Sequence, residues 1–252
     1  MPERPYPTTD LRELPTTPPE DVDKARAKNQ ARAFGADIGK LTEKFGADGR
    51  FAMLIVFQGM DASGKDGAVK AAFGQSSPIN IRVTSWKKPT AEEMAHDFLW
   101  RVHRRTPRKG EIAIWNRSHY EDVLIQRVRG WIDEETVDGR FESINDFERH
   151  LRRNGTIVLK FLLHTSYEEQ ERQLRERIDE RDKHYKHNPG DWEEREHWDA
   201  YMDAYSDVLA RSALPWIVVP TDKRWYRSYA IAKHVREALE ALNLEWPPLA
   251  DA

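Results

Sequence analysis

The stretch FAMLIVFQGMDASGKDGAVKAAF at residues 51–73 constrains the fold of this chain more than any other segment. Its first seven residues are apolar, as in a buried β-strand, and its last seven favour a helix. The residues between them have the spacing of a phosphate-binding loop, in which backbone N–H groups and the helix N-terminus hold phosphate oxygens. The alternative is a tight strand-to-helix turn whose glycines serve only geometry. We expect phosphate contacts from Gly59, Ala62, Ser63, Gly64, Lys65, Asp66 and Gly67.

Two carboxylates make this loop unusual. Asp66 occupies the position where Ser or Thr is normally expected, and Asp61 lies inside the loop. In the first turn of a helix, Asp66 interacts favourably with the helix dipole, by about 0.3–1 kcal/mol, and needs no further role. Asp61 has no such explanation, because phosphates repel a carboxylate unless a cation lies between them. We therefore expect Asp61 to position a bridging Mg²⁺, with Mn²⁺ as a candidate substitute.

A second acid is then expected at the end of a neighbouring strand. The apolar run at residues 111–115 is followed by NRSHYED, which supplies Arg117, Glu121 and Asp122. Phosphoryl transfer relies on metal ions, cations and in-line positioning, and these residues offer such groups. The alternative is that Glu121 and Asp122 begin a solvated helix.

Strand-like and helical patterns alternate along the chain. A helix is expected from Asp21 to about Phe45, with Gly46 as its stop. Alternation of strands and helices predicts a doubly wound α/β fold with a parallel five-stranded sheet, and ligands at the carboxyl ends of the strands. The predicted strands are residues 51–57, 79–85, 111–115, 156–163 and 216–219.

Length and composition fit one domain at residues 21–252, preceded by an arm at residues 1–20. The arm is expected to be extended, and either to wrap a surface or to fray, because it contains Pro2, Pro5, Pro7, Pro15, Pro18 and Pro19.

Charge and hydropathy exclude several classes of protein. The net charge of −3 gives no global attraction to nucleic acid, and the absence of cysteine excludes disulfides and thiolate metal sites. No apolar run approaches the roughly 18 residues of a membrane span. We expect a cytoplasmic protein that binds neither nucleic acid nor membranes.

The segments GMDASGKDG and NRSHYED resemble the Walker A and Walker B segments of the polyphosphate kinase 2 family. The pieces WKKPTAEEMAHDFLWRVHRRTPRKGEIAIWNRS, WDAYMDAYSDVL and PWIVVPTDK are also similar, so the resemblance runs from about Lys24 to Leu244. It implies a fold like that of thymidylate kinase. It also implies a homo-oligomer, a dimer or a tetramer, that transfers the terminal phosphate of inorganic polyphosphate reversibly to ADP, with AMP, GDP and GMP as further candidate acceptors.

The local charge pattern independently suits a long polyanion. Between Arg101 and Arg129 eight basic residues stand against three acidic ones. A chain of phosphates needs such a track of cations, because each contact is electrostatic and screened by salt. The alternative is a helix face whose charges serve only solvation.

Residues 166–190 are expected to form a helical lid, which in such kinases closes over the phosphates and excludes water. The dense charges of residues 166–188 also fit a solvent-exposed hairpin with i,i+4 ion pairs. The family's R-x-D-x-x-x-K-x-x-K pattern is present. Arg181 replaces a common Pro and Tyr185 a common Trp, which favours a member that accepts both AMP and ADP. The matching residues are Arg177, Asp179, Lys183 and Lys186.

The resemblance and the residues together assign roles. The candidate metal ligands are Asp61 and Asp122, and the other candidate catalytic residues are Lys65, Arg117 and Arg177. Besides the loop, the expected polyphosphate contacts are Lys87, Lys88, Arg127, Lys183 and Lys186. The expected nucleotide contacts are Asp61, Arg117, Glu121, Arg177 and Arg181.

Two other functions fit parts of the same sequence. An ATP-dependent kinase of nucleotides or small molecules would share the loop and the lid, and a non-catalytic phosphate- or nucleic-acid-binding module would use the basic stretch. The three histidines His96, His103 and His119 lack paired ligand spacing, which favours structural roles over a metal site. We expect the nine tryptophans to anchor the core and interfaces rather than to stack on nucleobases.

Overall fold

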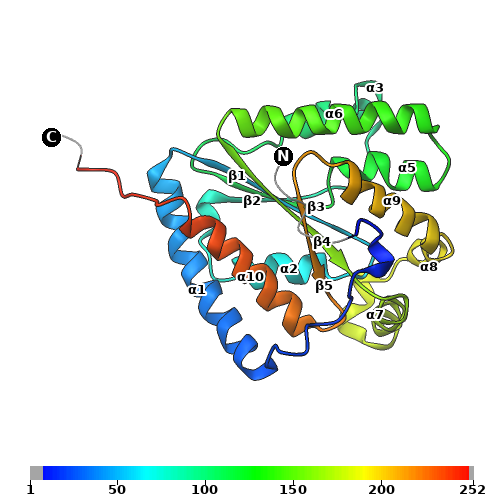
Figure 1. The fold of residues 1–252 in the computed structure, drawn as a ribbon, viewed down its shortest axis with the longest axis horizontal. Coiled ribbons are helices and arrows are strands. Elements are labelled where there is room, and N and C mark those ends of the chain that lie inside the picture. Colours follow the sequence, from blue (N-terminus) through cyan, green and yellow to red (C-terminus); the bar gives the residue numbers. More distant parts are fainter. Residues whose placement is uncertain (1–7, 250–252) are drawn as a thin grey trace.

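A computed structural model describes residues 8–249. Its five parallel strands form one sheet in the order β2-β3-β1-β4-β5 (Figure 1), which confirms the predicted doubly wound, five-stranded architecture. The strands are β1 (Ala52–Gly59), β2 (Ile81–Ser85), β3 (Ile112–Asn116), β4 (Thr156–His164) and β5 (Trp216–Pro220).

Helices cover both faces of the sheet, because successive strand residues point to opposite sides. On β1, Leu54 and Val56 belong to one core layer, and Met53 and Ile55 to the other. The first layer is completed by α6 (Glu134–Arg153) and α9 (Trp198–Arg211). The second, on the opposite side in Figure 1, is completed by α1 (Lys24–Asp48), α2 (Lys65–Phe73) and α10 (Arg224–Glu240).

The strand order brings distant loops to one edge. β1 and β3 are neighbours, with Phe57 opposite Asn116, so the loops that contain Asp61 and Arg117 lie side by side. The segments that follow β4 and β5 begin at the same edge, since all five strands are parallel. The shorter elements are η1 (Leu11–Glu13), η2 (Pro78–Asn80), α3 (Ala91–Ala95), α4 (Trp100–His103), η3 (His119–Val123), α5 (Ile125–Val128), α7 (Tyr167–Asp179), η4 (Arg181–Lys186) and α8 (Gly190–Arg195).

The predicted helix stop at Gly46 is wrong. α1 continues to Asp48, and Gly49 ends it in the left-handed conformation, with φ of 65°. Gly46 instead allows close packing, because a Cβ atom there would lie 1.9 Å from Nδ2 of Asn80. A glycine inside a helix costs only about 1 kcal/mol relative to alanine, so it need not end one.

The described part of the N-terminal arm, residues 8–20, wraps the domain rather than fraying. Leu11 is buried in the core layer of α9, and its N–H donates to Oγ of Ser206 at 2.9 Å. Further along, the N–H of Asp222 donates to the carbonyl of Thr16 at 3.1 Å. The prolines at positions 2, 5 and 7 lie outside the described residues. Across residues 8–249 no helix has the length and apolar character needed to cross a membrane.

Candidate active site

The loop after β1 has backbone angles that suit a phosphate-binding loop. Ala62 and Gly64 adopt φ values of 63° and 93°. Lys65 begins α2 and is buried, and its Nζ donates to the carbonyls of Gly59 at 2.7 Å and Met60 at 3.0 Å. Burial lowers the pKa of Lys65 to about 8. Within the described chain this ammonium forms no ion pair, which leaves it available to an anion.

Asp61 and Arg117 join the two loops at the carboxyl edge. Nη2 of Arg117 donates to Oδ1 of Asp61, and its Nη1 lies 3.4 Å from Oε2 of Glu121. Burial would raise the pKa of Asp61, but the charges of Arg117, Lys65 and Arg177 hold it below its usual value. Arg117 has φ of 65°, a strained conformation for a non-glycine residue of the kind often found at functional sites.

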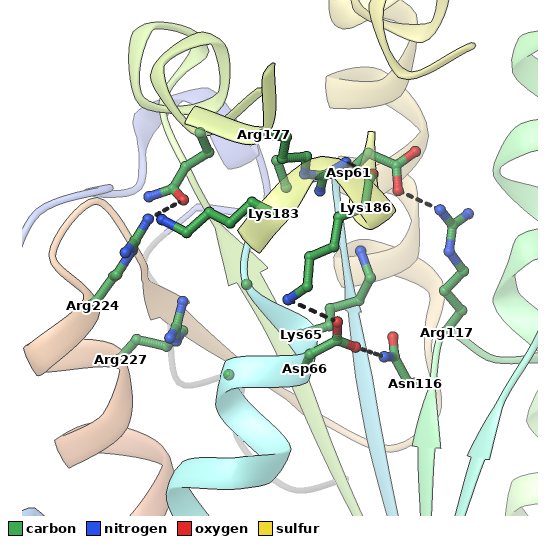
Figure 2. Close-up of a pocket in the computed structure, with 14 residues that line it drawn as sticks. Asp61, Lys65, Asp66, Asn116, Arg117, Arg177, Lys183, Lys186, Arg224 and Arg227 are labelled. Carbon is green, nitrogen blue, oxygen red and sulfur yellow. Dashed lines mark hydrogen bonds and ion pairs between the residues drawn. The ribbon is translucent and has the colours of Figure 1, made fainter. Parts of the chain in front are cut away.

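A basic cavity of about 390 Å³ opens over the loop (Figure 2). Among the described residues that line it, only Asp61 and Asp66 carry carboxylates, and none is aromatic. Seven cationic side chains line it: Lys65, Arg117, Arg177, Lys183, Lys186, Arg224 and Arg227.

An aromatic cavity of about 630 Å³ lies beside it. Its apolar lining comes from Trp86, Pro89, Ile125 and Trp131, of which Trp131 is 65% exposed. It also contains three cations, Lys87, Lys88 and Arg101, that do not line the basic cavity.

The two cavities share a polar wall. In this wall Asp66 accepts a hydrogen bond from Nδ2 of Asn116 at 2.7 Å and lies 3.7 Å from Nζ of Lys186. Asp66 is in the first turn of α2, as a helix-start carboxylate would be, and it also contacts the lid. The residues that line both cavities are Asp61, Asp66, Asn116, Arg117, Arg177 and Lys186.

The predicted lid is formed by α7 and η4. Arg177, Lys183 and Lys186 line the basic cavity, whereas Arg172 and Arg175 form i,i+3 and i,i+4 pairs on the same segment. The segment therefore combines a cavity-lining surface with the ion-paired surface expected of a charged hairpin.

Contacts at both ends of α7 fix its position. Arg177 pairs with Asp191, and Nε2 of Gln170 donates to the carbonyl of Asp61 at 3.0 Å. Arg195 of α8 donates to Oε1 of Gln170 at 3.1 Å and to the carbonyl of Tyr167 at 2.8 Å. The short helix α8, which follows the lid, thus holds α7 in place.

Asp122 is buried rather than part of a solvated helix. Its Oδ1 accepts a hydrogen bond from Gln126, while its Oδ2 has no hydrogen-bond partner in the described chain. Burial raises the pKa of Asp122 to about 6 against the opposing charges of Arg101 and Arg140. An unpartnered carboxylate oxygen on a residue that lines the aromatic cavity fits a divalent cation.

Asp61 and Asp122 could hold Mg²⁺, since both line the aromatic cavity. Residues 8–249 contain no group of three or more acidic, histidine or cysteine side chains arranged to hold a metal alone. This fits Mg²⁺, which commonly uses one or two carboxylates and completes its shell with phosphate oxygens and water.

Several sequence-predicted residues lie outside the two cavities. Arg127 pairs with Glu134 and Asp207, and Arg181 is exposed on η4. Ser63 is buried beneath the loop. Of the eight basic residues from Arg101 to Arg129, only Arg101 and Arg117 line either cavity.

Each of the three histidines packs against an aromatic side chain. His96 stacks on Trp100 with ring centroids 4.1 Å apart, and His103 contacts the edge of Phe147. His119 is fully buried beside Trp115. These contacts support the structural roles that the spacing favoured.

Among the cavity-lining groups that were not predicted as site residues are two arginines and two tryptophans. The arginines are Arg224 and Arg227 of α10, and the tryptophans are Trp86 and Trp131, which were expected to be anchors. No local motif marks them. The strand order could have suggested the arginines, because α10 begins at the same sheet edge as the loop.

Comparisons with known proteins agree with this architecture. The family model for Polyphosphate kinase 2 (PPK2) matches residues 21–247. An AMP/ADP-polyphosphate phosphotransferase of Meiothermus ruber is 43% identical over 213 residues, which cover 83% of this chain and 80% of that protein. An ADP-polyphosphate phosphotransferase of Rhodopseudomonas palustris is 38% identical over 230 residues, with coverages of 85% and 80%.

A solved structure also matches nearly the whole fold. The crystal structure of polyphosphate kinase 2 from Arthrobacter aurescens TC1 has a TM-score of 0.94 and 38% identity, and the match covers 99% of this chain and 91% of that one. These matches confirm the resemblance carried by the two Walker segments. The chain belongs to the polyphosphate kinase 2 family.

Proposed function

We propose that this protein transfers the terminal phosphate of inorganic polyphosphate to a nucleoside diphosphate or monophosphate, in a reversible reaction that depends on Mg²⁺. One observation carries the proposal: a basic cavity and an aromatic cavity meet at a shared wall that contains Asp61, Arg117 and Arg177. A phosphate compound bound in each cavity could therefore place its terminal phosphate next to these three residues. The names of the relatives point to the same pair of substrates.

The basic cavity suits the polyphosphate donor. Its seven cations provide charge-assisted hydrogen bonds to a polyanion, while a nucleobase would find no aromatic side chain there. This lining favours a chain of phosphates over ATP as the donor, and so favours a polyphosphate kinase over an ATP-dependent kinase.

The aromatic cavity suits the acceptor nucleotide. Trp131 offers an exposed ring for stacking on a nucleobase, and Lys87, Lys88 and Arg101 offer charges to its phosphates. Stacking does not read the edge of a base, which supports acceptance of adenine and guanine nucleotides. One relative named for AMP and ADP, together with the lid departures at Arg181 and Tyr185, supports both AMP and ADP as acceptors.

Asp61 and Asp122 would hold Mg²⁺ together with phosphate oxygens of the substrates. When bound, the ion would neutralise part of the negative charge where the two substrates meet. The repulsion between them is otherwise the main obstacle to their approach.

The remaining groups position the reaction. Lys65 and the loop amides hold the donor, and a phosphate oxygen of the acceptor, oriented with the help of Asp61, attacks the terminal phosphorus. The P–O bond to the shortened chain breaks as the new P–O bond forms, so no covalent enzyme intermediate is needed. Arg117 and Arg177 neutralise charge on the transferred group, with Lys183 and Lys186 assisting from the lid.

Three further expectations belong to this proposal: a homo-oligomer, either a dimer or a tetramer, a cytoplasmic location, and no role for nucleic acid or membranes. A non-catalytic binding module would leave the paired carboxylates Asp61 and Asp122 without a purpose.

The test is an acceptor panel. Purified protein receives polyphosphate, Mg²⁺ and one of AMP, ADP, GMP or GDP, with no other phosphate source, and the nucleotides are then separated. We expect ATP from ADP, and ADP from AMP. Metal-independent binding of polyphosphate with no product from any acceptor would support the binding module instead.

A further inference from the structure

The guanidinium of Arg227 is a buried cation without a partner. The residue is 9% exposed and lines the basic cavity. Within residues 8–249 its side chain forms no ion pair or hydrogen bond, and its Nε is a buried donor without an acceptor. The neighbouring cations differ: Arg117, Arg177, Lys183 and Arg224 each pair with at least one carboxylate.

No carboxylate of residues 8–249 pairs with the positive charge at this position. Arg227 lies in the first turn of α10 and against the first turn of α2, and cations are disfavoured at helix N-termini. Burial, and then the nearby charge of Arg224, lowers the pKa of Arg227 to about 10. An unpaired buried charge is costly, so this environment is suited to a bound anion.

The phosphate-binding loop is shaped to admit this guanidinium. A Cβ atom on Gly64 would lie 1.8 Å from Nη1 of Arg227, and one on Gly67 would lie 2.4 Å from Nη2. Gly64 needs to be glycine for its φ of 93° as well. The backbone of Gly67 does not require glycine, because it lies inside a regular helix. The space that Gly67 leaves for Arg227 therefore explains why this position is glycine.

Figure 2 shows Arg227 and Arg224 on one side of the basic cavity and Asp61 and Arg117 on the opposite side, with Lys65 between them. A phosphate next to Arg227 therefore lies on the side of the cavity opposite Asp61 and Arg117, where transfer is proposed.

We propose that Arg227 binds a phosphate unit of the polyphosphate donor that is not itself transferred. The inference rests on the proposed function for the identity of the donor. Arg227 would anchor the chain behind its terminal phosphate and would determine donor affinity more than turnover. Its contribution should appear in the KM for the donor, because the anchored unit stays in the same place as the terminal bond breaks.

The experiment compares Arg227→Gln with Lys233→Gln, an exposed charge on the same helix. Losing a charged hydrogen bond should raise the KM for tripolyphosphate about 10- to 100-fold, with kcat and the KM for ADP changed less than about 3-fold. Arg227→Lys should restore part of the affinity, because it keeps the charge. A fall in kcat with an unchanged donor KM would overturn the inference.

Gly67→Ala separates anchoring from folding. The added methyl displaces the guanidinium without removing its charge, so it should raise the donor KM in the parent protein. In the Arg227→Gln background it should have no further effect on that KM. Equal effects in both backgrounds would show that position 67 acts independently of Arg227, which would contradict the inference.

Calorimetry with tripolyphosphate alone distinguishes failure of this inference from failure of the proposed function. Binding that is lost in Arg227→Gln supports the anchor even if the parent protein transfers no phosphate. Transfer by the parent, with unchanged binding and KM in the variant, overturns the anchor and leaves the function intact. A parent that neither binds tripolyphosphate nor transfers phosphate contradicts both.

Discussion

Arg117 and Asp61 form an ion pair that ties the loop after β3 to the phosphate-binding loop after β1. The pair lies in the wall shared by the two cavities, and Lys65 and Arg177 add to the positive field around the carboxylate. That field keeps Asp61 ionised although it is partly buried. It therefore remains an anionic oxygen donor at the point where two polyanions meet.

Replacing Asp61 by Asn should lower the transfer rate by about 100- to 1,000-fold, because it removes a preorganised charged group at the reacting centre. The fold should persist, since the amide keeps the shape of the side chain. Steady-state rates and thermal unfolding check both statements. Asp146→Asn, an exposed surface substitution, is the matched control. Near-normal turnover by the Asp61 variant would refute its assigned role.

The rate should depend on the charge of Lys65. Its pKa is about 8 in the free protein, so its positive charge, and its attraction for the donor, decline as pH rises through 8. We expect kcat/KM for the donor to fall above pH 8. Bound phosphates favour the ammonium form, so the corresponding fall in kcat should occur at higher pH. Profiles from pH 7 to 9.5 at constant ionic strength test this, and a flat donor profile would count against it.

A buried ion pair contacts Tyr120 of η3, the short helix that also contains Glu121 and Asp122. Nζ of Lys160 lies 2.7 Å from Oε2 of Glu148 and also donates to the hydroxyl of Tyr120 at 2.7 Å; neither charged side chain is exposed. Lys160→Met alone, or Glu148→Gln alone, should destabilise the protein by about 3–5 kcal/mol, because the remaining partner is left without its counterpart.

Denaturant unfolding measures this effect. The double variant Lys160→Met/Glu148→Met should recover part of the loss, because it leaves no buried charge unpaired. Single variants as stable as the parent would show that the pair is unimportant for folding.

Trp131→Ala should weaken acceptor binding. Stacking of a base on an aromatic ring is worth about 1–3 kcal/mol, so the KM for ADP should rise about 5- to 100-fold, and that for GDP similarly. Trp131→Phe should retain much of the affinity. The control is Trp246→Ala, which removes another exposed tryptophan. An unchanged KM for both nucleotides in Trp131→Ala would show that the base does not stack there.

Much of the fold followed from local sequence patterns. The strand at residues 51–57 and the loop through Lys65 could be predicted because each is specified by residues that are consecutive in the sequence: an apolar run for the strand and the glycine spacing for the loop. The pairing of Asp61 with the Arg117 segment followed from the rule that neighbouring parallel strands end at one edge. The sequence left open whether Asp122 is a site residue or begins a solvated helix, and its burial in the structure excludes the second alternative.

Other features depend on packing that no local pattern encodes. Arg227 reaches the loop only because β4 and β5 complete one side of the sheet, which brings α10 against α2. Trp115 is a core anchor and Trp131 is an exposed cavity wall, although their residue type is the same. Gly46 resembles a helix stop in sequence, yet the nearby Asn80 determines its role.

The most direct test of the proposed function is ATP formation from polyphosphate and ADP alone. Purified protein is given both with Mg²⁺ and no other phosphate source, and ATP is measured over time beside Asp61→Asn and a sample with excess EDTA. We predict ATP in proportion to the amount of parent protein, with a matching loss of polyphosphate, and almost none in the two controls. No ATP from polyphosphate, while ATP phosphorylates a small acceptor, would contradict the account and identify an ATP-dependent kinase.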